Sequence, residues 1–181
     1  RDTAGNAEGQ LPSAEATTFV NPPVCRRPLK STLVLKNQDK DKKDNLTWQW
    51  TKGEATTRGD FGNPTVGTSY NLLIRSAAGP FSAFFLPPGG FWKDLGTKGF
   101  KYGDKLGANS GVTKAALKPG VSGKAAVMVG GKGAGLGLPA LAGLATPVSV
   151  RLENGQSGVC WESVYDTATK ATAEQWKGVV K

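Results

Sequence analysis

Short apolar runs that alternate with polar residues, separated by clusters of turn-forming residues, are the feature of this sequence that most restricts its fold. In residues 29–36, leucine and serine alternate with lysine, threonine and valine, and this period of two is typical of a β-strand. Residues 46–51 repeat the pattern with Trp48 and Trp50 on one face, where packing in a core is the default. Further apolar runs lie at residues 69–75, 81–86, 99–102, 112–117, 124–129, 148–152 and 159–165.

Turn-forming residues separate most of these runs. The chain has Gly 25 and Pro 11 among 181 residues, and Asn154-Gly155 between two apolar runs is a strong hairpin signal. No helical pattern of ten or more residues precedes the C-terminal part, where residues 167–177 are expected to form a short helix or a loose tail. The sequence therefore predicts an all-β fold, an antiparallel β-sandwich of about nine short strands.

The first part of the chain has a different character. Residues 1–28 are predicted to form an extended N-terminal arm or linker, and residues 29–181 the β-sandwich domain, because residues 1–24 are small, polar and without a period. One interpretation is a disordered terminus. The other is an assembly arm that adds a strand to a neighbouring subunit, with Phe19, Val20 and Val24 as its inserting residues.

The chain has two cysteines, Cys25 and Cys160. In an exported protein a disulfide between them is favoured over two buried thiols, and it would stabilise the fold by roughly 4–5 kcal/mol in the chain-entropy model. No apolar segment approaches the ~18 residues that a membrane span needs. No signal-peptide core is present, so we expect a secreted or cell-surface protein whose signal peptide has been removed.

The chain is basic, with a formal net charge of +9. The excess is concentrated in residues 61–120, but the lysines are spread out, as in Lys93, Lys98, Lys101 and Lys105. Nucleic-acid binders cluster their basic residues and interleave aromatic ones, so no nucleic-acid partner is predicted. A charged, soluble surface is the simplest interpretation. Weak attraction to an acidic polysaccharide is the alternative that stays open.

Signals for catalysis and for metal or nucleotide binding are poor. The chain has no histidine, which excludes imidazole bases and His-ligated metals. The glycines of residues 130–139 match neither a P-loop nor a dinucleotide fingerprint and indicate a flexible or closely packed connection. Lysines among the carboxylates of residues 37–45 oppose a calcium site. No spacing supports a glycosidase pair among the scattered carboxylates Asp60, Asp94, Asp104, Glu153 and Glu162. We expect no enzyme, no cofactor and no metal.

Five tryptophans offer one further candidate site. Exposed aromatic rings stack on sugars, although aromatic residues also dominate sandwich cores. Trp92 follows a Pro/Gly loop and Trp176 lies in the tail, so these two are the better surface candidates. Together with Tyr102 they form the candidate glycan platform.

Residues 92–105, WKDLGTKGFKYGDK, resemble a β-sandwich unit of predicted exported proteins from environmental bacteria, deltaproteobacteria among them. That unit shows W-K-x-x-G-T-K-G-[FY]-K-Y-x-D-K, and later a glycine-lysine run, G-K-G-A-x-L-x-L-P and C-W-E, which correspond here to residues 116–124, 131–139 and 160–162. The resemblance covers about residues 29–181. It implies an exported β-sandwich and assigns no catalytic residue.

These observations favour a non-catalytic, exported structural subunit of an extracellular fibre or surface layer. Such a subunit would self-associate into a homopolymer, through its N-terminal arm, by β-strand addition. The alternative is a carbohydrate-binding or adhesive β-sandwich module, and a third interpretation is an accessory domain of an envelope enzyme.

Overall fold

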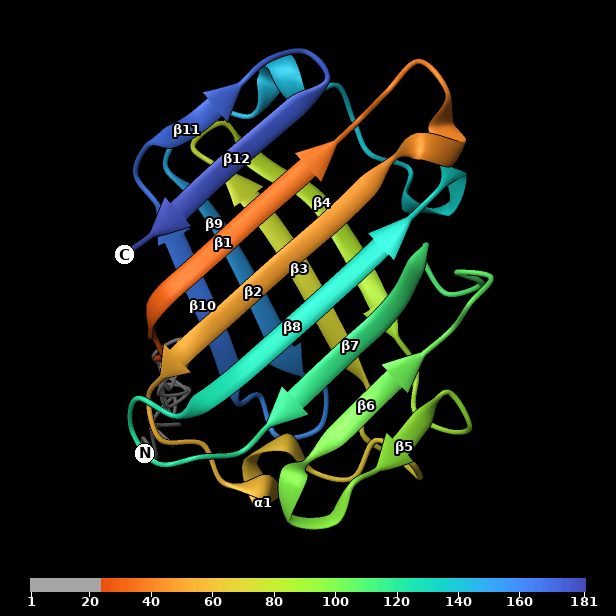
Figure 1. Cartoon of the computed structure of the whole chain (residues 1–181), viewed down its shortest axis with the longest axis vertical. Helices are drawn as coiled ribbons and strands as arrows, with labels where there is room; N and C mark the ends of the chain where they lie inside the picture. Colours follow the sequence, from red (N-terminus) through yellow and green to blue (C-terminus); the bar gives the residue numbers. More distant parts are fainter. Residues whose placement is uncertain (1–23) are drawn as a thin grey trace, which may run out of the picture.

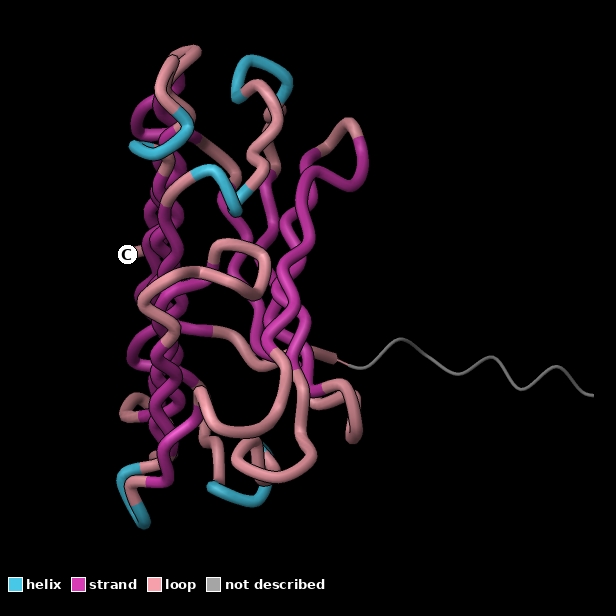
Figure 2. The backbone as a smooth tube through the Cα atoms, turned by 90° about the vertical axis from the view of Figure 1, so that its right-hand side faces the viewer, coloured by secondary structure: helices cyan, strands magenta, loops and turns pink. Residues whose placement is uncertain are grey.

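The protein is a β-sandwich of two antiparallel sheets. The structure, a computed structural model, describes residues 24–181. The larger sheet has eight strands in the order β11-β12-β1-β2-β8-β7-β6-β5, and the smaller has four in the order β10-β9-β3-β4. Figure 1 looks onto the larger sheet with the smaller one behind it, and Figure 2 shows the two layers from the side. The predicted all-β sandwich is confirmed.

The strands of the larger sheet are β1 (Pro28–Lys36), β2 (Asn45–Gly53), β5 (Trp92–Asp94), β6 (Phe100–Gly103), β7 (Val112–Lys118), β8 (Ala125–Lys132), β11 (Ala168–Ala171) and β12 (Gln175–Val180). Those of the smaller sheet are β3 (Tyr70–Ser76), β4 (Gly79–Leu86), β9 (Val148–Asn154) and β10 (Cys160–Tyr165). One short helix, α1 (Arg58–Phe61), and four 3-10 turns, η1 (Asp41–Lys43), η2 (Gly96–Lys98), η3 (Ala134–Leu136) and η4 (Leu141–Gly143), complete the elements of residues 24–181.

The core lies between the sheets because one side of each strand is apolar. Trp48 and Trp50 of β2 are fully buried, as the alternation of residues 46–51 predicts. Their indole nitrogens donate to β10 across the core, from Trp48 Nε1 to Ser163 Oγ at 3.2 Å and from Trp50 Nε1 to the Glu162 carbonyl at 3.3 Å. These bonds satisfy polar groups that would be costly to bury unpaired, so they help to fix the two sheets in register.

Three strands differ from the sequence prediction. The tail at residues 167–177, expected to be a short helix or loose, instead forms β11 and the first half of β12, and β12 pairs with β1. The pairing of β12 with β1 explains why the tail is a strand: Trp176 of β12 lies opposite Leu35 and is buried against Tyr165. The strand β5 was also missed, because three residues are too few to show a period.

A disulfide joins Cys25 to Cys160, as predicted. It ties the N-terminal segment to the outer edge of β10, where the Arg26 amide donates to the Cys160 carbonyl at 2.9 Å and the Glu162 amide donates to the Arg26 carbonyl at 2.9 Å. Arg27 adds an ion pair of 2.9 Å with Glu162. Residues 25–28, assigned to the arm from their sequence, are therefore part of the sandwich.

The glycine-rich residues 130–139 are closely packed. A Cβ on Gly131 would lie 2.7 Å from the carbonyl oxygen of Gly111, and one on Gly111 would lie 2.4 Å from the backbone nitrogen of Leu136. Two backbones approach here because neither has a side chain. Of residues 130–139, only 130–132 are in a strand, and η3 follows, so this segment is not extended along its whole length.

Candidate functional site

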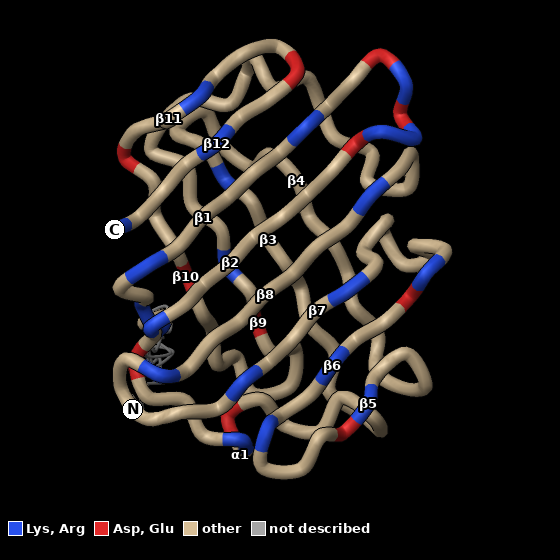
Figure 3. Tube along the Cα trace, in the orientation of Figure 1, with Lys and Arg blue, Asp and Glu red and all other residues tan. Residues whose placement is uncertain are grey.

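The outward side of the eight-stranded sheet is rich in lysine. Alternation directs one residue in two away from the core. The outward residues of the strands in this sheet are lysine, threonine, glutamine or asparagine, or they are apolar residues such as Val34, Ala126 and Met128. We call this surface the lysine face. Its lysines are Lys30, Lys36, Lys93, Lys101, Lys114, Lys118, Lys132 and Lys177. Figure 3 shows these basic positions spread over the sheet, with acidic residues mainly at its turns and margins.

Strand register places some lysines directly opposite one another. Lys93 of β5 pairs with Lys101 of β6, and Lys170 of β11 pairs with Lys177 of β12. Like charges at directly opposed positions destabilise a sheet. None of the outward residues of these strands is a carboxylate that would offset this repulsion. The face therefore holds uncompensated positive charge, which an anionic ligand would neutralise.

The carboxylates of the molecule are engaged elsewhere, by arginines. Within residues 24–181, every ion pair joins an arginine to a carboxylate: Arg26–Asp60, Arg27–Glu162, Arg58–Asp94 and Arg151–Glu162. No lysine of this part of the chain is in one. The lysines of the face thus keep their charge free for a ligand.

Two of these pairings lower the pKa of the carboxylate. Burial works to raise the pKa of Asp60, but hydrogen bonds from Thr57 and Arg26 outweigh it and hold the pKa below its usual value. The Gly96 amide and the Arg58 guanidinium lower the pKa of Asp94. These carboxylates are charged partners in structural contacts: Asp60 closes the capping box at the start of α1 with Thr57.

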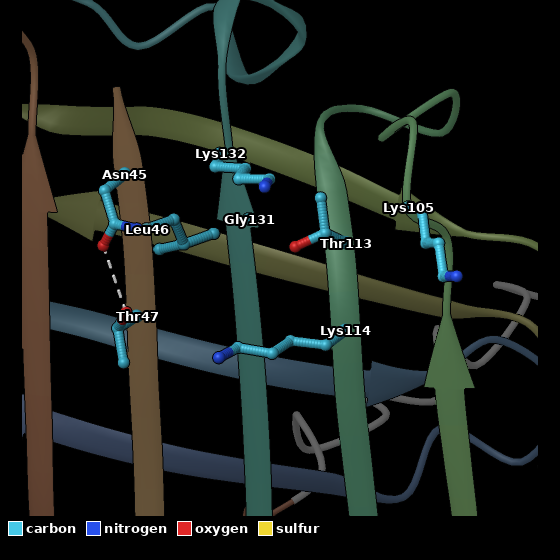
Figure 4. Close-up of a pocket in the computed structure, with 8 residues that line it drawn as sticks. All are labelled: Asn45, Leu46, Thr47, Lys105, Thr113, Lys114, Gly131 and Lys132. Atoms are coloured by element: carbon cyan, nitrogen blue, oxygen red, sulfur yellow. Dashed lines mark hydrogen bonds between the residues drawn. The ribbon is translucent and has the colours of Figure 1, made fainter. Parts of the chain in front are cut away.

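A hollow of about 440 Å³ lies on the lysine face where β2, β8 and β7 run side by side. Figure 4 shows Lys105, Lys114 and Lys132 around it, with Thr47 and Thr113 on neighbouring strands. We call it the β8 hollow. Gly131 and Lys132 of β8 line it, and beside them the Lys114 side chain lies over Gly130, where a Cβ would be 2.7 Å from Lys114 Cε. The three ammonium groups and the hydroxyls of Thr47 and Thr113 suit an anionic group that also carries hydroxyls.

The prediction of a glycan platform is wrong, because its three rings are in the core. Trp92 is 5% exposed, Tyr102 0% and Trp176 1%. Trp92 Nε1 donates to the Pro87 carbonyl at 2.9 Å, and its ring packs against Tyr70 and Tyr102. The sequence placed Trp92 after a Pro/Gly loop, but that loop folds back over the ring instead of exposing it.

The predicted assembly arm falls mostly outside the described residues. Phe19 and Val20 lie there, whereas Val24 is 96% exposed at the start of the described chain. Within residues 24–181, β4 pairs on one side only, with β3. At the opposite end of the same sheet, the outer edge of β10 is bridged by Arg26.

Sequence reasoning missed the lysine face. The lysines are far apart along the chain, and for that reason the sequence indicates dispersed charge. The eight-stranded sheet nevertheless brings them together on one side. A signal was present, since lysines occupy the polar phase of the alternating runs, as in residues 29–36 and 112–118. The phase alone does not show which strands are neighbours, and the order β1-β2-β8-β7-β6 brings together lysines of distant segments.

Comparisons with protein-family models, with curated proteins and with solved structures found no match to this chain. Across residues 24–181, no cluster of three or more acidic or cysteine side chains is arranged to hold a metal ion. The helices of the same residues include none with the length and apolar character of a membrane span.

Proposed function

We propose that this protein is a non-catalytic, adhesive β-sandwich module that holds an acidic polysaccharide on its lysine face. The observation that carries the proposal is the free positive charge of that face: its lysines stand among hydroxyl and amide side chains, and the ion pairs of residues 24–181 use arginines instead. Complementary charge attracts a polyanion. The Cys25–Cys160 disulfide supports an extracellular or cell-surface location, where such polymers occur and disulfides persist.

The side chains of the face favour a polysaccharide over a nucleic acid. Proteins that bind single-stranded nucleic acid stack bases on aromatic rings and use arginine. The outward residues of β1, β2, β6, β7, β8 and β12 include neither an aromatic residue nor an arginine. Threonine, asparagine and glutamine side chains, in contrast, exchange hydrogen bonds with sugar hydroxyls.

Affinity electrophoresis on one polymer backbone with different charges tests this function. Neutral dextran, carboxymethyl-dextran and dextran sulfate are cast into native gels. We expect retardation by both charged dextrans, and relief of that retardation as salt is raised, because exposed charges are screened beyond about 10 Å at 0.1 M salt. Equal retardation by neutral dextran, or none by either charged polymer, would contradict the proposal.

A pair of triple variants separates the face from net charge. The first replaces Lys101, Lys114 and Lys118, on the outward side of β6 and β7 in the lysine face, by glutamine. The second replaces Lys40, Lys42 and Lys43, which are exposed at the turn between β1 and β2, and changes the net charge equally. We expect the first to weaken retardation about tenfold, as the loss of several exposed charge contacts implies, and the second to have little effect. Equal loss in both would show attraction to net charge alone.

A second candidate function is the fibre or surface-layer subunit, which the open edge of β4 supports. Strands at a sheet edge accept an added strand, and the described chain starts at the other end of the same sheet. In this proposal the arm, with Phe19, Val20 and Val24, pairs with β4 of the next copy. Electron microscopy and size-exclusion chromatography of the full chain and of a chain lacking residues 1–24 test it. Polymers that persist after the deletion would exclude the arm.

A further inference from the structure

Three shallow hollows on the lysine face join into one path across the strands. The middle one, of about 200 Å³, lies over β7, β8 and β2 and includes Ala126. It shares Ala116 and Lys118 with a hollow of about 610 Å³ beside β6. It shares Gln49 and Thr51 with a hollow of about 270 Å³ beside β1 and β12. We call the joined path the track.

The track is long enough for several units of a polymer. It crosses β6, β7, β8, β2, β1 and β12, which are consecutive neighbours in the sheet. Neighbouring strands lie about 4.8 Å apart, so the five intervals span about 24 Å. Figure 2 shows the larger sheet edge-on as an extended layer, with the smaller sheet on its other side.

Positive charge is concentrated at the two ends of the track. Lys98, Lys101 and Lys124 line the end beside β6, and Lys30 and Lys181 line the end beside β12. Apart from Lys118, which it shares with the β6 end, the middle hollow has no charged side chain: Gln49 and Thr51 provide an amide and a hydroxyl, and Ala116, Ala126 and Met128 are apolar. A ligand that fits has separated negative charges joined by a neutral, hydroxyl-bearing stretch.

We propose that the ligand is a linear acidic polysaccharide that lies across the strands along the track, with anionic groups at both lysine ends and its hydroxyls against Gln49 and Thr51. This inference rests on the proposed function and narrows it, because it requires an extended chain and one orientation. A single small anion would reach only one end.

The length of the ligand tests the track. Uronate oligosaccharides of one repeating sequence and increasing length are titrated by calorimetry at low salt. We expect the affinity to rise with length until the chain spans about 24 Å and then to level off. Replacing Lys30 and Lys181 by glutamine is expected to weaken the long oligosaccharide about tenfold while leaving the shortest, held at the β6 end, within about twofold.

A blocking variant tests the orientation without changing charge. Ala126→Trp places a large ring on the outward side of β8, in the middle of the track. Ala83→Trp makes the same replacement on β4, on the exposed surface of the other sheet. We expect Ala126→Trp to abolish the gain in affinity with length, and Ala83→Trp to keep it. Thermal unfolding of both variants confirms that they are folded.

The outcomes separate this inference from the proposed function. Affinity that does not depend on length, or that Ala126→Trp leaves intact, would overturn the track while charged dextrans still bind. Loss of binding to every acidic polymer would overturn both. A DNA oligonucleotide of the same length and a phosphatidylserine vesicle are the remaining probes. Tighter binding of either one than of the longest uronate would overturn the assignment to a polysaccharide.

Discussion

The three tyrosines of the chain are all buried, and this affects the response to alkaline pH. The Tyr165 hydroxyl lies 2.5 Å from Ser31 Oγ inside the core. Burial raises the pKa of Tyr165 to about 12, and burial also raises the pKa of Tyr70 and of Tyr102. A charged phenolate is costly in such surroundings.

We expect the folded protein to resist tyrosine ionisation. Because the folded pKa of Tyr165 exceeds the unfolded value near 10, its contribution to stability is complete below pH 10. That contribution is lost between pH 10 and about 12, at about 1.4 kcal/mol for each pH unit. Absorbance at 295 nm, recorded against pH with and without denaturant, checks this. Tyr165→Phe should remove the native phase near pH 12. Native phenolate at pH 10 would contradict the prediction.

Neighbouring glycines in β8 should respond very differently to the same change. A Cβ on Gly131 meets the Gly111 carbonyl oxygen at 2.7 Å, which is backbone. A Cβ on Gly130 meets the Lys114 side chain, which is flexible and on the surface. We expect Gly131→Ala to lower the free energy of unfolding by about 1–3 kcal/mol, as overpacking does, and Gly130→Ala to change it by less than about 0.5 kcal/mol. Urea denaturation measures both, and equal effects would refute the argument.

At the scale of the elements, the Cys25–Cys160 disulfide attaches the segment before β1 to β10. The disulfide closes a loop with a sequence separation of 135, and long loops gain most from closure. We expect the double variant Cys25→Ala/Cys160→Ala to lose about 2–5 kcal/mol of unfolding free energy in urea without reductant. Reduced wild-type protein is the control and should match the variant. A variant as stable as the oxidised wild type would contradict this role.

The strands differ in how well they can be predicted from the sequence. Residues 29–36 and 46–51 could be predicted because strict alternation marks strands that have one buried side. The tail could not, because Gly178 interrupts its short alternation and its partner, β1, lies more than a hundred residues earlier. The prediction of the candidate site failed for a similar reason: Trp92 and Tyr102 each lie next to a lysine in the sequence, but their strands turn both rings inward. Pairing between distant segments, which no local pattern contains, also created the lysine face.

For the molecule as a whole, the net charge of +9 acts against stability where it is concentrated. Lys93 of the edge strand β5 lies opposite Lys101 of its neighbour β6, without an acidic partner among the outward residues. Self-repulsion of this kind opposes the compact state and weakens as salt screens it. A face kept for a polyanion would therefore reduce the stability of the free protein.

We expect the melting temperature to rise between 10 mM and 300 mM sodium chloride, because the Debye length falls from about 30 Å to below about 8 Å. Lys101→Gln should stabilise the protein at low salt, by about 0.2–1 kcal/mol, since it removes one member of a like-charged cross-strand pair. This gain should shrink at 300 mM. Lys42→Gln, at the exposed turn, is the matched control with the same change of charge. Differential scanning calorimetry at both salt concentrations measures all three proteins. Two outcomes would contradict this: Lys101→Gln destabilises the protein at low salt, or it changes the melting temperature by the same amount as Lys42→Gln at both salt concentrations. Either one would mean that Lys93 and Lys101 do not repel each other in the folded protein. The lysine face would then hold no repulsion that a ligand could relieve.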